Sequence, residues 1–176
     1  AAAAAMARRA TSPPIGQGRY GTVYKVIKEE DDVETILAAK VCSIEEVRTP
    51  SPSAGRSNST VDKIVKPLRK EAEILSYLNH PNVVSFFGYE RTFSHFTLFF
   101  ELMSGGSLRQ YINKVGALDE ELSKRCMRQI VLAVTYLHDE CDIVHRDIKA
   151  GNVLLNANCT VVKLCDFGGA KRLRKD

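Results

Sequence analysis

A short stretch in the C-terminal half of the chain places two carboxylates and an amide in an order suited to phosphoryl transfer. It reads His145-Arg146-Asp147-Ile148-Lys149-Ala150-Gly151-Asn152, and Asp166-Phe167-Gly168 follows. Asp147 is suited to accept the proton of an attacking hydroxyl group, while Asn152 and Asp166 offer hard oxygen ligands for Mg²⁺. The spacing predicts a catalytic carboxylate next to a magnesium site; a polar loop that only joins two helices is the less specific alternative.

A glycine-rich motif near the N-terminus predicts a second phosphate-binding element. It reads Ile15-Gly16-Gln17-Gly18-Arg19-Tyr20-Gly21-Thr22-Val23. Dinucleotide-binding folds carry similar glycines, but there a helix follows them. Here the next residues, 22–27, are rich in β-branched and aromatic types, and the acidic turn 29–32 comes after them. This pattern predicts strand, turn and strand, so that the glycine backbone closes over phosphates with its N–H groups exposed.

Taken in order, with Leu37-Ala38-Ala39-Lys40 between them, these motifs resemble those of eukaryotic protein kinases, with Ile148 where leucine is usual. The resemblance spans the chain from about Ile15 to its end. Lys149 is typical of serine/threonine rather than tyrosine kinases. Within the family the chain is most similar to MAP kinase kinase kinases of the MEKK type, whereas Ala150-Gly151-Asn152 is commoner in Ste20-like kinases and keeps that alternative open. The segments that carry the MEKK likeness are 104–108, 116–118, 128–130, 136–138, 143–149 and 163–173.

The resemblance implies an α+β, protein-kinase-like fold: a five-stranded antiparallel N-lobe with the family's αC helix, then the start of a mainly helical C-lobe. The expected divisions are an N-terminal tail over 1–14, an N-lobe over 15–103 with a flexible insert near 48–62, and a partial, truncated C-lobe over 104–176 that ends just after Asp166-Phe167-Gly168. Because proline cannot donate a ladder hydrogen bond, Pro13-Pro14 predicts that the first strand begins near Ile15.

Apolar spacing predicts the main helices and hairpins. Pro67 suits only the first turn of a helix, which predicts a helix over 67–78 with Val65, Leu68, Ala72 and Leu75 on its apolar face. Asp119 is the expected N-cap of a helix that runs to about Tyr136. Residues 96–100 are an expected strand, and residues 153–155 and 160–164 an expected hairpin. The Thr-Pro and Ser-Pro pairs of the insert, at 49–52, suit proline-directed kinases, or belong to an unregulated surface insert.

The resemblance also implies roles for single residues around ATP and Mg²⁺. Gly16, Gly18 and Gly21 would cover the phosphates, and Lys40 would contact them while Glu71 holds it; Glu73 is expected to be a solvated charge. Lys149 would neutralise charge on the transferred phosphate. The adenine contacts implied are Val23 and Ala38 above the ring, Leu154 below it, the backbone of Glu101 and Met103 beside it, and Phe100 behind it. Ile15 is a further implied nucleotide-binding residue. Leu75, Phe86, His145 and Phe167 would form an apolar column.

Composition limits the classes of function. The chain has 176 residues, of which 44% are hydrophobic and 26% charged, as in ordinary globular proteins. No apolar run is long enough to predict a membrane span. The five cysteines form no C-x-x-C pair, which indicates reduced thiols and a cytoplasmic location. The net charge of +4 is better explained by a solvated surface than by nucleic-acid binding.

Two hypotheses of function remain. One is an active serine/threonine kinase that phosphorylates a protein substrate, a MAP kinase kinase by resemblance, with an upstream activating kinase or a scaffold as partner. The other is a truncated, non-catalytic module that binds nucleotide or partners. Intact Lys40, Asp147, Asn152 and Asp166 favour the first. The end of the sequence eight residues after Gly168 favours the second, and predicts an isolated chain that is marginally stable and self-associates.

Overall fold

The computed structural model describes residues 8–18, 21–30, 33–44 and 58–173. The chain divides into two compact units, which are described separately. The first comprises the residues up to Ala72 together with Phe86–Leu102, and the second comprises Glu73–Ser85 and the residues from Met103 onward. None of the helices in the described part of the chain combines the length and the apolar composition that crossing a membrane requires.

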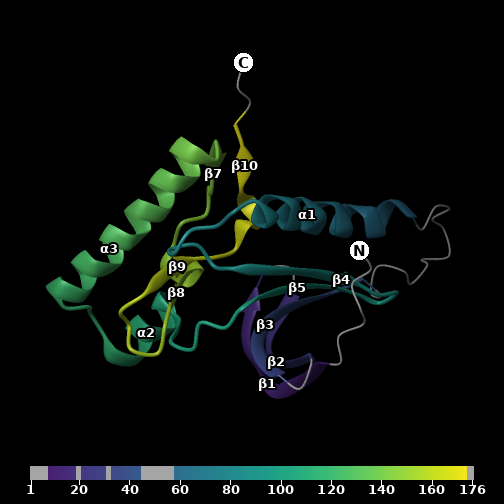
Figure 1. The fold of residues 1–176 in the computed structure, drawn as a ribbon, viewed down its shortest axis with the longest axis horizontal. Coiled ribbons are helices and arrows are strands. Elements are labelled where there is room, and N and C mark those ends of the chain that lie inside the picture. Colours follow the sequence, from purple (N-terminus) through teal and green to yellow (C-terminus); the bar gives the residue numbers. More distant parts are fainter. Residues whose placement is uncertain (1–7, 19–20, 31–32, 45–57, 174–176) are drawn as a thin grey trace. The chain divides into compact units, whose positions relative to one another are not determined.

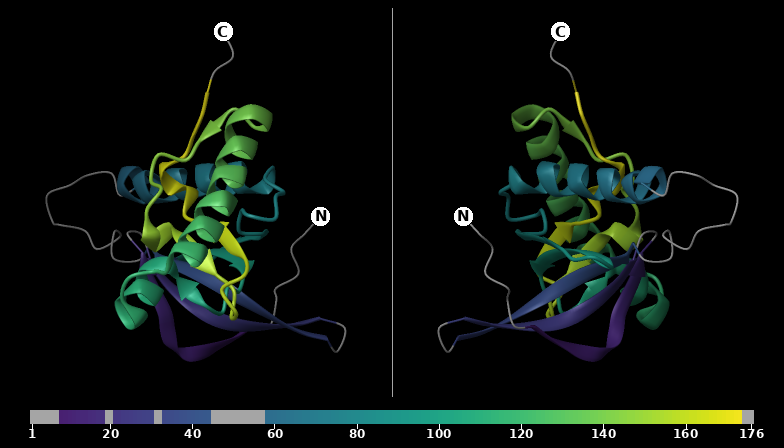
Figure 2. Two further views of the ribbon diagram at one scale, coloured as in Figure 1. Left: turned by 90° about the vertical axis from the view of Figure 1, so that its left-hand side faces the viewer. Right: turned by 90° about the vertical axis from the view of Figure 1, so that its right-hand side faces the viewer.

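The first unit is built on a five-stranded antiparallel sheet (Figure 1). Its strands are β1 (Arg8–Gly18), β2 (Gly21–Glu30), β3 (Val33–Ser43), β4 (Phe86–Arg91) and β5 (His95–Glu101), in the order β1-β2-β3-β5-β4. The long β2–β3 hairpin keeps one register from Thr22↔Val41 to Glu30↔Val33 and is seen from two sides in Figure 2. Val26, Leu37, Ala39 and Phe99 form a buried cluster within the sheet. The expected five-stranded antiparallel sheet is therefore confirmed.

The predicted start of the first strand at Ile15 is wrong. β1 begins at Arg8, and its pairing with β2 is interrupted between Thr11 and Gly16. Pro13 and Pro14 lie inside this irregularity, and β1 is an edge strand. An edge strand with a bulge tolerates prolines because no ladder hydrogen bond is required of them there. The strand therefore continues on both sides of the prolines instead of starting after them.

The helix of this region also starts earlier than predicted. Helix α1 spans Asn58–Ser76 and carries Pro67 in its interior. The prediction of a flexible insert near 48–62 is therefore wrong for residues 58–62, which are helical. Residues 48–57 lie outside the described part of the chain. Pro67 is exposed, but Val61 and Val65, two turns and one turn before Leu68, are buried and extend the apolar stripe. Burying each valine side chain stabilises the fold by about 1.5–3 kcal/mol, so the two together offset the cost of about 3 kcal/mol for a proline inside a helix.

The second unit contains helices and short strands. Its elements are β6 (Gly106–Ser107), α2 (Leu108–Val115), α3 (Glu120–Thr135), a π-helical turn η1 (Tyr136–Glu140), β7 (Ile143–Val144), η2 (Ala150–Asn152), β8 (Val153–Leu155), β9 (Val162–Leu164), η3 (Phe167–Gly169) and β10 (Lys171–Arg172). The Asp119 side chain accepts a hydrogen bond from the Leu122 N–H at 2.7 Å, which confirms it as the N-cap of α3. The predicted hairpin is confirmed as the antiparallel pair β8 and β9.

Two strand pairs determine where the polar loops of this unit lie. β8 pairs with β6 on one side and with β9 on the other. β7 pairs with β10, so that Val144 lies opposite Lys171, and the two strands are side by side in Figure 1. The segments that follow β7 and precede β10 are therefore held against each other. These are the segments that carry Asp147 and Asp166.

The glycine-rich strand pair yields a test of the sheet. A Cβ atom at Gly21 would collide with the main chain of Val41 and lie 2.8 Å from the Cys42 Sγ, whereas one at Gly16 would meet only Val23 at 3.8 Å. We predict that Gly21→Ala lowers the free energy of unfolding by about 2 kcal/mol through overpacking. The matched control, Gly16→Ala, should change it by less than about 0.5 kcal/mol. Urea denaturation of both variants measures this, and equal effects would contradict the packing described.

Candidate active site

The first unit contains a buried ion pair. The Lys40 Nζ lies 2.9 Å from Glu71 Oε1 and 3.2 Å from Oε2, and the two side chains are only 10% and 2% exposed. Lys40 comes from the middle of β3 and Glu71 from α1. Two buried opposite charges with bidentate contact hold each other in one geometry, because either alone would be a costly uncompensated charge. Glu73, two residues on, is exposed.

The sheet register gathers other predicted residues around this lysine. Gly16 pairs with Val23, and Val23 pairs with Lys40, so these three residues form a row across β1, β2 and β3. Ala38, two residues before Lys40, shares its face of the sheet and pairs with Phe100. A lysine ammonium, a valine, an alanine and a glycine backbone thus line one region of the sheet.

The remaining residues predicted for nucleotide binding are divided between the units. Gly18 pairs with Gly21 where β1 meets β2, and Glu101 is the last residue of β5, opposite Leu37. Ile15 is exposed on the edge strand β1. Met103 and Leu154 belong to the second unit, where Leu154 lies in β8 opposite Lys163.

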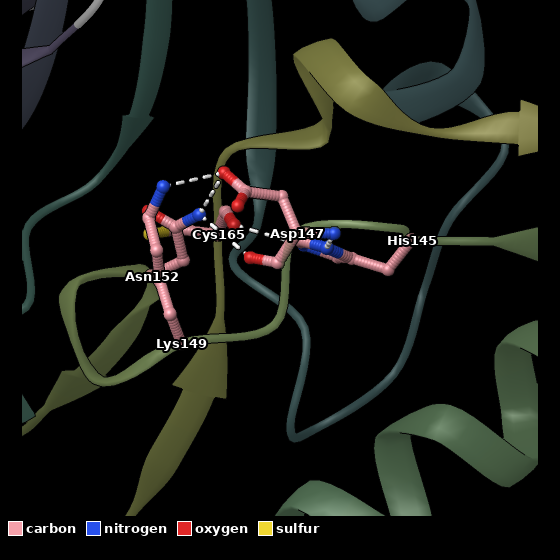
Figure 3. A network of polar contacts seen from close by, with 5 residues as sticks. All are labelled: His145, Asp147, Lys149, Asn152 and Cys165. Carbon is pink, nitrogen blue, oxygen red and sulfur yellow. Dashed lines mark hydrogen bonds and ion pairs between the residues drawn. The ribbon is translucent and has the colours of Figure 1, made fainter.

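In the second unit, Asp147 is the centre of a polar network (Figure 3). Its Oδ2 accepts hydrogen bonds from Lys149 Nζ at 2.7 Å and from Asn152 Nδ2 at 2.9 Å. The hydrogen bond from Lys149, helped by that from Asn152, lowers the pKa of Asp147 below its ordinary value. The side chain remains 42% exposed. Asp147 is therefore an ionised carboxylate that is fixed on one side and open to solvent, as a hydroxyl acceptor has to be.

His145 connects the Asp147 segment to the segment that carries Asp166. Its Nε2 lies 3.0 Å from the Cys165 carbonyl, and its Nδ1 accepts the Asp147 N–H at 3.3 Å. Since a carbonyl can only accept and an amide N–H can only donate, both contacts require the neutral ring with its hydrogen on Nε2. Burial lowers the pKa of His145, which favours that neutral form. Its ring also meets Phe167 edge-on, with centroids 4.8 Å apart.

Asn152 has the atoms that a metal ligand in this position needs. Its Nδ2 donates to the main-chain oxygen and to Oδ2 of Asp147, while its Oδ1 accepts no hydrogen bond from any described residue. The residue is buried, with 6% exposure. A buried carbonyl oxygen without a donor is costly unless a cation or water occupies it. The Cys165 N–H donates to the Asn152 main-chain oxygen at 3.0 Å, which brings the main chain next to Asp166 close to Asn152. The residues present therefore fit a hard divalent cation.

Three contacts of this region were not predicted from the sequence. Arg146 adopts a left-handed conformation and its Nε donates to the Gly169 main-chain oxygen at 2.6 Å. Asn82 and Gln129 hydrogen-bond to each other at 2.8 Å and to β9.

The sequence does carry a signal for Gln129, because it lies three residues after buried Cys126 and four residues before buried Ala133 on α3. A polar residue on an apolar stripe needs a buried partner.

Comparison with known proteins identifies the family. The family model described as the protein kinase domain matches residues 10–176. The chain belongs to the protein kinase domain family. The five-stranded sheet and the Lys40–Glu71 pair belong to one unit of the chain, and Asp147, Asn152 and Asp166 belong to the other.

The similar proteins are named as kinases of MAP kinase cascades. The chain is 34% identical over 160 residues to the mitogen-activated protein kinase kinase kinase MST11 of Pyricularia oryzae, covering 90% of this chain and 16% of that protein. It is 33% identical over 159 residues to mitogen-activated protein kinase kinase kinase 1 of Homo sapiens (90% and 10%). It is 37% identical over 161 residues to kinase kinase kinase 1a of Physcomitrium patens (92% and 19%). The chain thus spans between a tenth and a fifth of the length of these relatives.

The buried ion pair predicts a difference between two neighbouring glutamates. We predict that Glu71→Gln lowers the free energy of unfolding by about 3 kcal/mol, because it leaves the buried Lys40 ammonium without a counter-charge. Glu73→Gln makes the same chemical change at an exposed position and should cost less than about 0.5 kcal/mol. Urea denaturation of both variants decides, and a Glu71→Gln variant as stable as Glu73→Gln would disprove the energetic importance of the pair.

The neutral His145 predicts a dependence of stability on pH. Since the folded chain holds the pKa of His145 below its ordinary 6.5, the unfolded chain binds a proton first as pH falls. Stability should therefore be complete above about pH 6.5 and decrease as pH falls toward the folded pKa. His145→Gln should reduce this decrease, without abolishing it because burial also lowers the pKa of His80.

The matched control for this prediction is His138→Gln, at an exposed histidine of the same unit. Its unfolding free energy should follow pH as the parent's does. Denaturation at about pH 7.5 and about pH 5.5 measures the three proteins. A His145→Gln chain that loses as much stability on acidification as the parent would show that His145 is not held neutral.

Proposed function

We propose that this chain is the catalytic core of a serine/threonine protein kinase that transfers the γ-phosphate of ATP to a MAP kinase kinase. The observation that carries the proposal is the Asp147 carboxylate, held by Lys149 and Asn152 while still open to solvent. Membership of the protein kinase family supports ATP as the phosphate donor. The Lys149 position, and relatives named as mitogen-activated protein kinase kinase kinases, support the serine/threonine specificity and the substrate class.

In the proposed reaction Asp147 positions the substrate hydroxyl and takes up its proton. The hydroxyl oxygen forms a bond to the γ-phosphorus as the bond from that phosphorus to the β–γ bridging oxygen breaks, and ADP leaves. The proton passes to the Asp147 carboxylate and then to solvent. Because the Lys149 contact lowers the pKa of Asp147, the carboxylate is ionised at neutral pH but is a weak base. Its main contribution is therefore orientation, with proton uptake late in the transfer.

Other residues of both units would bind the phosphates and the metal. In the first unit the Lys40 ammonium, held by Glu71, supplies a cation for the α- and β-phosphates, and Gly16, Gly18 and Gly21 allow close backbone approach. In the second unit Asn152 Oδ1 and the Asp166 carboxylate are the proposed ligands of Mg²⁺. A bound magnesium ion would neutralise phosphate charge.

The adenine contacts and the cellular setting belong to the same proposal. Val23 and Ala38, on the face of the sheet that carries Lys40, suit an apolar surface for the base. The five cysteines all lie among the described residues, and none of them is in a disulfide; on this ground we propose a cytoplasmic location. An upstream activating kinase or a scaffold is proposed as partner by analogy with cascade kinases. The insert at 49–52, with its Thr-Pro and Ser-Pro pairs, lies outside the described residues.

The proposal predicts different effects of Asp147→Asn on chemistry and on binding. Phosphate transfer from ATP to a purified, catalytically inactive MAP kinase kinase should fall by about 10²- to 10⁴-fold, since an amide cannot take up the hydroxyl proton. Affinity for ATP with Mg²⁺ should change little, because Asp147 acts on the hydroxyl and not on the nucleotide. Asp139→Asn, at an exposed aspartate of η1, is the control and should keep full activity.

Three results would contradict parts of this proposal. Equal transfer by Asp147→Asn and the parent would remove Asp147 from the mechanism. Transfer onto tyrosine, read by phosphoamino-acid analysis, would refute the serine/threonine assignment. A parent chain that binds ATP with Mg²⁺ but phosphorylates no MAP kinase kinase would favour a non-catalytic nucleotide-binding module.

A further inference from the structure

Among the described residues, strand β9, which leads to Asp166, has a neighbouring strand on one side only. On that side it pairs with β8. On the other side, the Val162 N–H donates to Gln129 Oε1 at 2.9 Å, and the Val162 carbonyl accepts from Asn82 Nδ2 at 2.8 Å. The Leu164 N–H donates to the Asn82 main-chain oxygen, and the Leu164 carbonyl accepts from the Val84 N–H, both at 2.9 Å. Two side-chain amides and a short loop segment thus take the place of a second strand.

The two amides also bind each other, and we call Asn82 and Gln129 together the amide clamp. Asn82 Nδ2 donates to Gln129 Oε1 at 2.8 Å, and Gln129 Nε2 donates to the Thr160 carbonyl at 3.0 Å. Gln129 comes from α3, whereas Asn82 comes from the loop after α1, and Asn82 is 7% exposed. Loss of either amide would leave buried main-chain groups of β9 unsatisfied, at about 1–3 kcal/mol each.

The clamp acts immediately before the proposed metal ligand. β9 ends at Leu164, and the next residue, Cys165, donates its N–H to the Asn152 carbonyl and accepts a hydrogen bond from His145. Asp166 follows with a left-handed backbone, φ 62°. If a second strand lay beside β9, β9 could shift along it by two residues and keep its side chains on the same face. Two side-chain amides at fixed positions can hydrogen-bond the β9 main chain in one register only.

We propose that Asn82 and Gln129 are positioning residues for the metal site, and that they place Asp166 relative to Asn152 through β9. The inference rests on the proposed function, since it assumes that these two residues bind Mg²⁺ with the nucleotide. Neither amide is among the proposed contacts of the nucleotide or the metal. Their loss should weaken metal-dependent binding more than binding of the nucleotide alone, because only the metal requires both ligands at fixed positions.

The first measurement is hydrogen exchange of the chain without nucleotide. In the parent, the amides of Val162 and Leu164 should be protected as strongly as that of Lys163 between them. In Gln129→Leu the Val162 amide should exchange at least about tenfold faster, since its acceptor is gone. Arg128→Leu, the same substitution at the exposed neighbouring residue, is the matched control and should leave the exchange unchanged. An unprotected Val162 amide in the parent would disprove the clamp.

The second measurement separates positioning from stability. At a fixed ATP concentration, the Mg²⁺ concentration for half-maximal binding should rise by about tenfold or more in Gln129→Leu and stay unchanged in Arg128→Leu. Binding of ATP in the presence of a chelator should be the same in both variants. Gln129→Glu keeps an oxygen acceptor for Asn82 and Val162, and should restore the Mg²⁺ requirement to near that of the parent. If Gln129→Leu does not fold, Asn82→Asp, which keeps the shape but loses both donated hydrogen bonds, takes its place with the same expected rise.

The outcomes are distinguishable. A parent chain that binds no ATP under any Mg²⁺ concentration overturns the proposed function, and the inference with it. A parent with Mg²⁺-dependent binding, and a folded Gln129→Leu or Asn82→Asp variant with the same Mg²⁺ requirement, overturns the inference alone and leaves the amides a purely structural role.

Discussion

The arrangement of the second unit depends on one constraint: the loop that carries Asp147 and the segment that carries Asp166 must be held together by groups that each have only one way to bond. The two ends of the Asn152 amide have different partners: Nδ2 donates to Asp147, and Oδ1 accepts no hydrogen bond from any described residue. The two ring nitrogens of His145 also have different partners: Nε2 lies against the Cys165 carbonyl, and Nδ1 accepts the Asp147 N–H. Because neither residue can be reversed without losing a partner, these contacts fix Asn152 against Asp147, and fix the Cys165 main chain, next to Asp166, against His145.

The first unit applies the same logic to a charge. A lysine in the middle of a strand is tolerated there because Glu71 from α1 reaches it with both carboxylate oxygens. The sheet register then aligns Lys40 with Val23 and Gly16, and the absence of a side chain at Gly21 lets β2 lie against the backbone of β3. The close pairing of β2 with β3 therefore depends on Gly21, where a side chain would collide with the Val41 main chain.

Much of this could be predicted from the sequence because the informative residues are close together along the chain. The spacing from Asp147 to Asn152, the cap at Asp119 and the β8–β9 hairpin are local patterns, and local patterns determine turns and helix ends. The start of α1 could not be obtained in this way. Pro67 is a strong local signal against a helix interior, and it is outweighed by the burial of Val61 and Val65, which is a tertiary effect. The same holds for β1, where an irregular edge pairing accommodates Pro13 and Pro14.

The amide clamp shows the other limit of sequence reasoning. Asn82 and Gln129 are 47 residues apart, and nothing in their immediate neighbourhoods specifies a common partner. Only the polar residue on the apolar stripe of α3 indicates that a buried acceptor is required. The family resemblance assigns roles mainly to residues that would contact the nucleotide or the metal. Asn82 and Gln129 instead hydrogen-bond to the strand that precedes such a residue, and only the structure reveals them.

We propose that Asn152 Oδ1 and the Asp166 carboxylate together bind a Mg²⁺ ion that serves a bound nucleotide. Calorimetric titration of the chain with ATP, once with Mg²⁺ and once with a chelator, tests it most directly. The affinity for ATP should be at least about tenfold higher with Mg²⁺, as expected when protein oxygens share the ion with phosphates. Equal affinity under both conditions, by a chain shown to be folded, would contradict it.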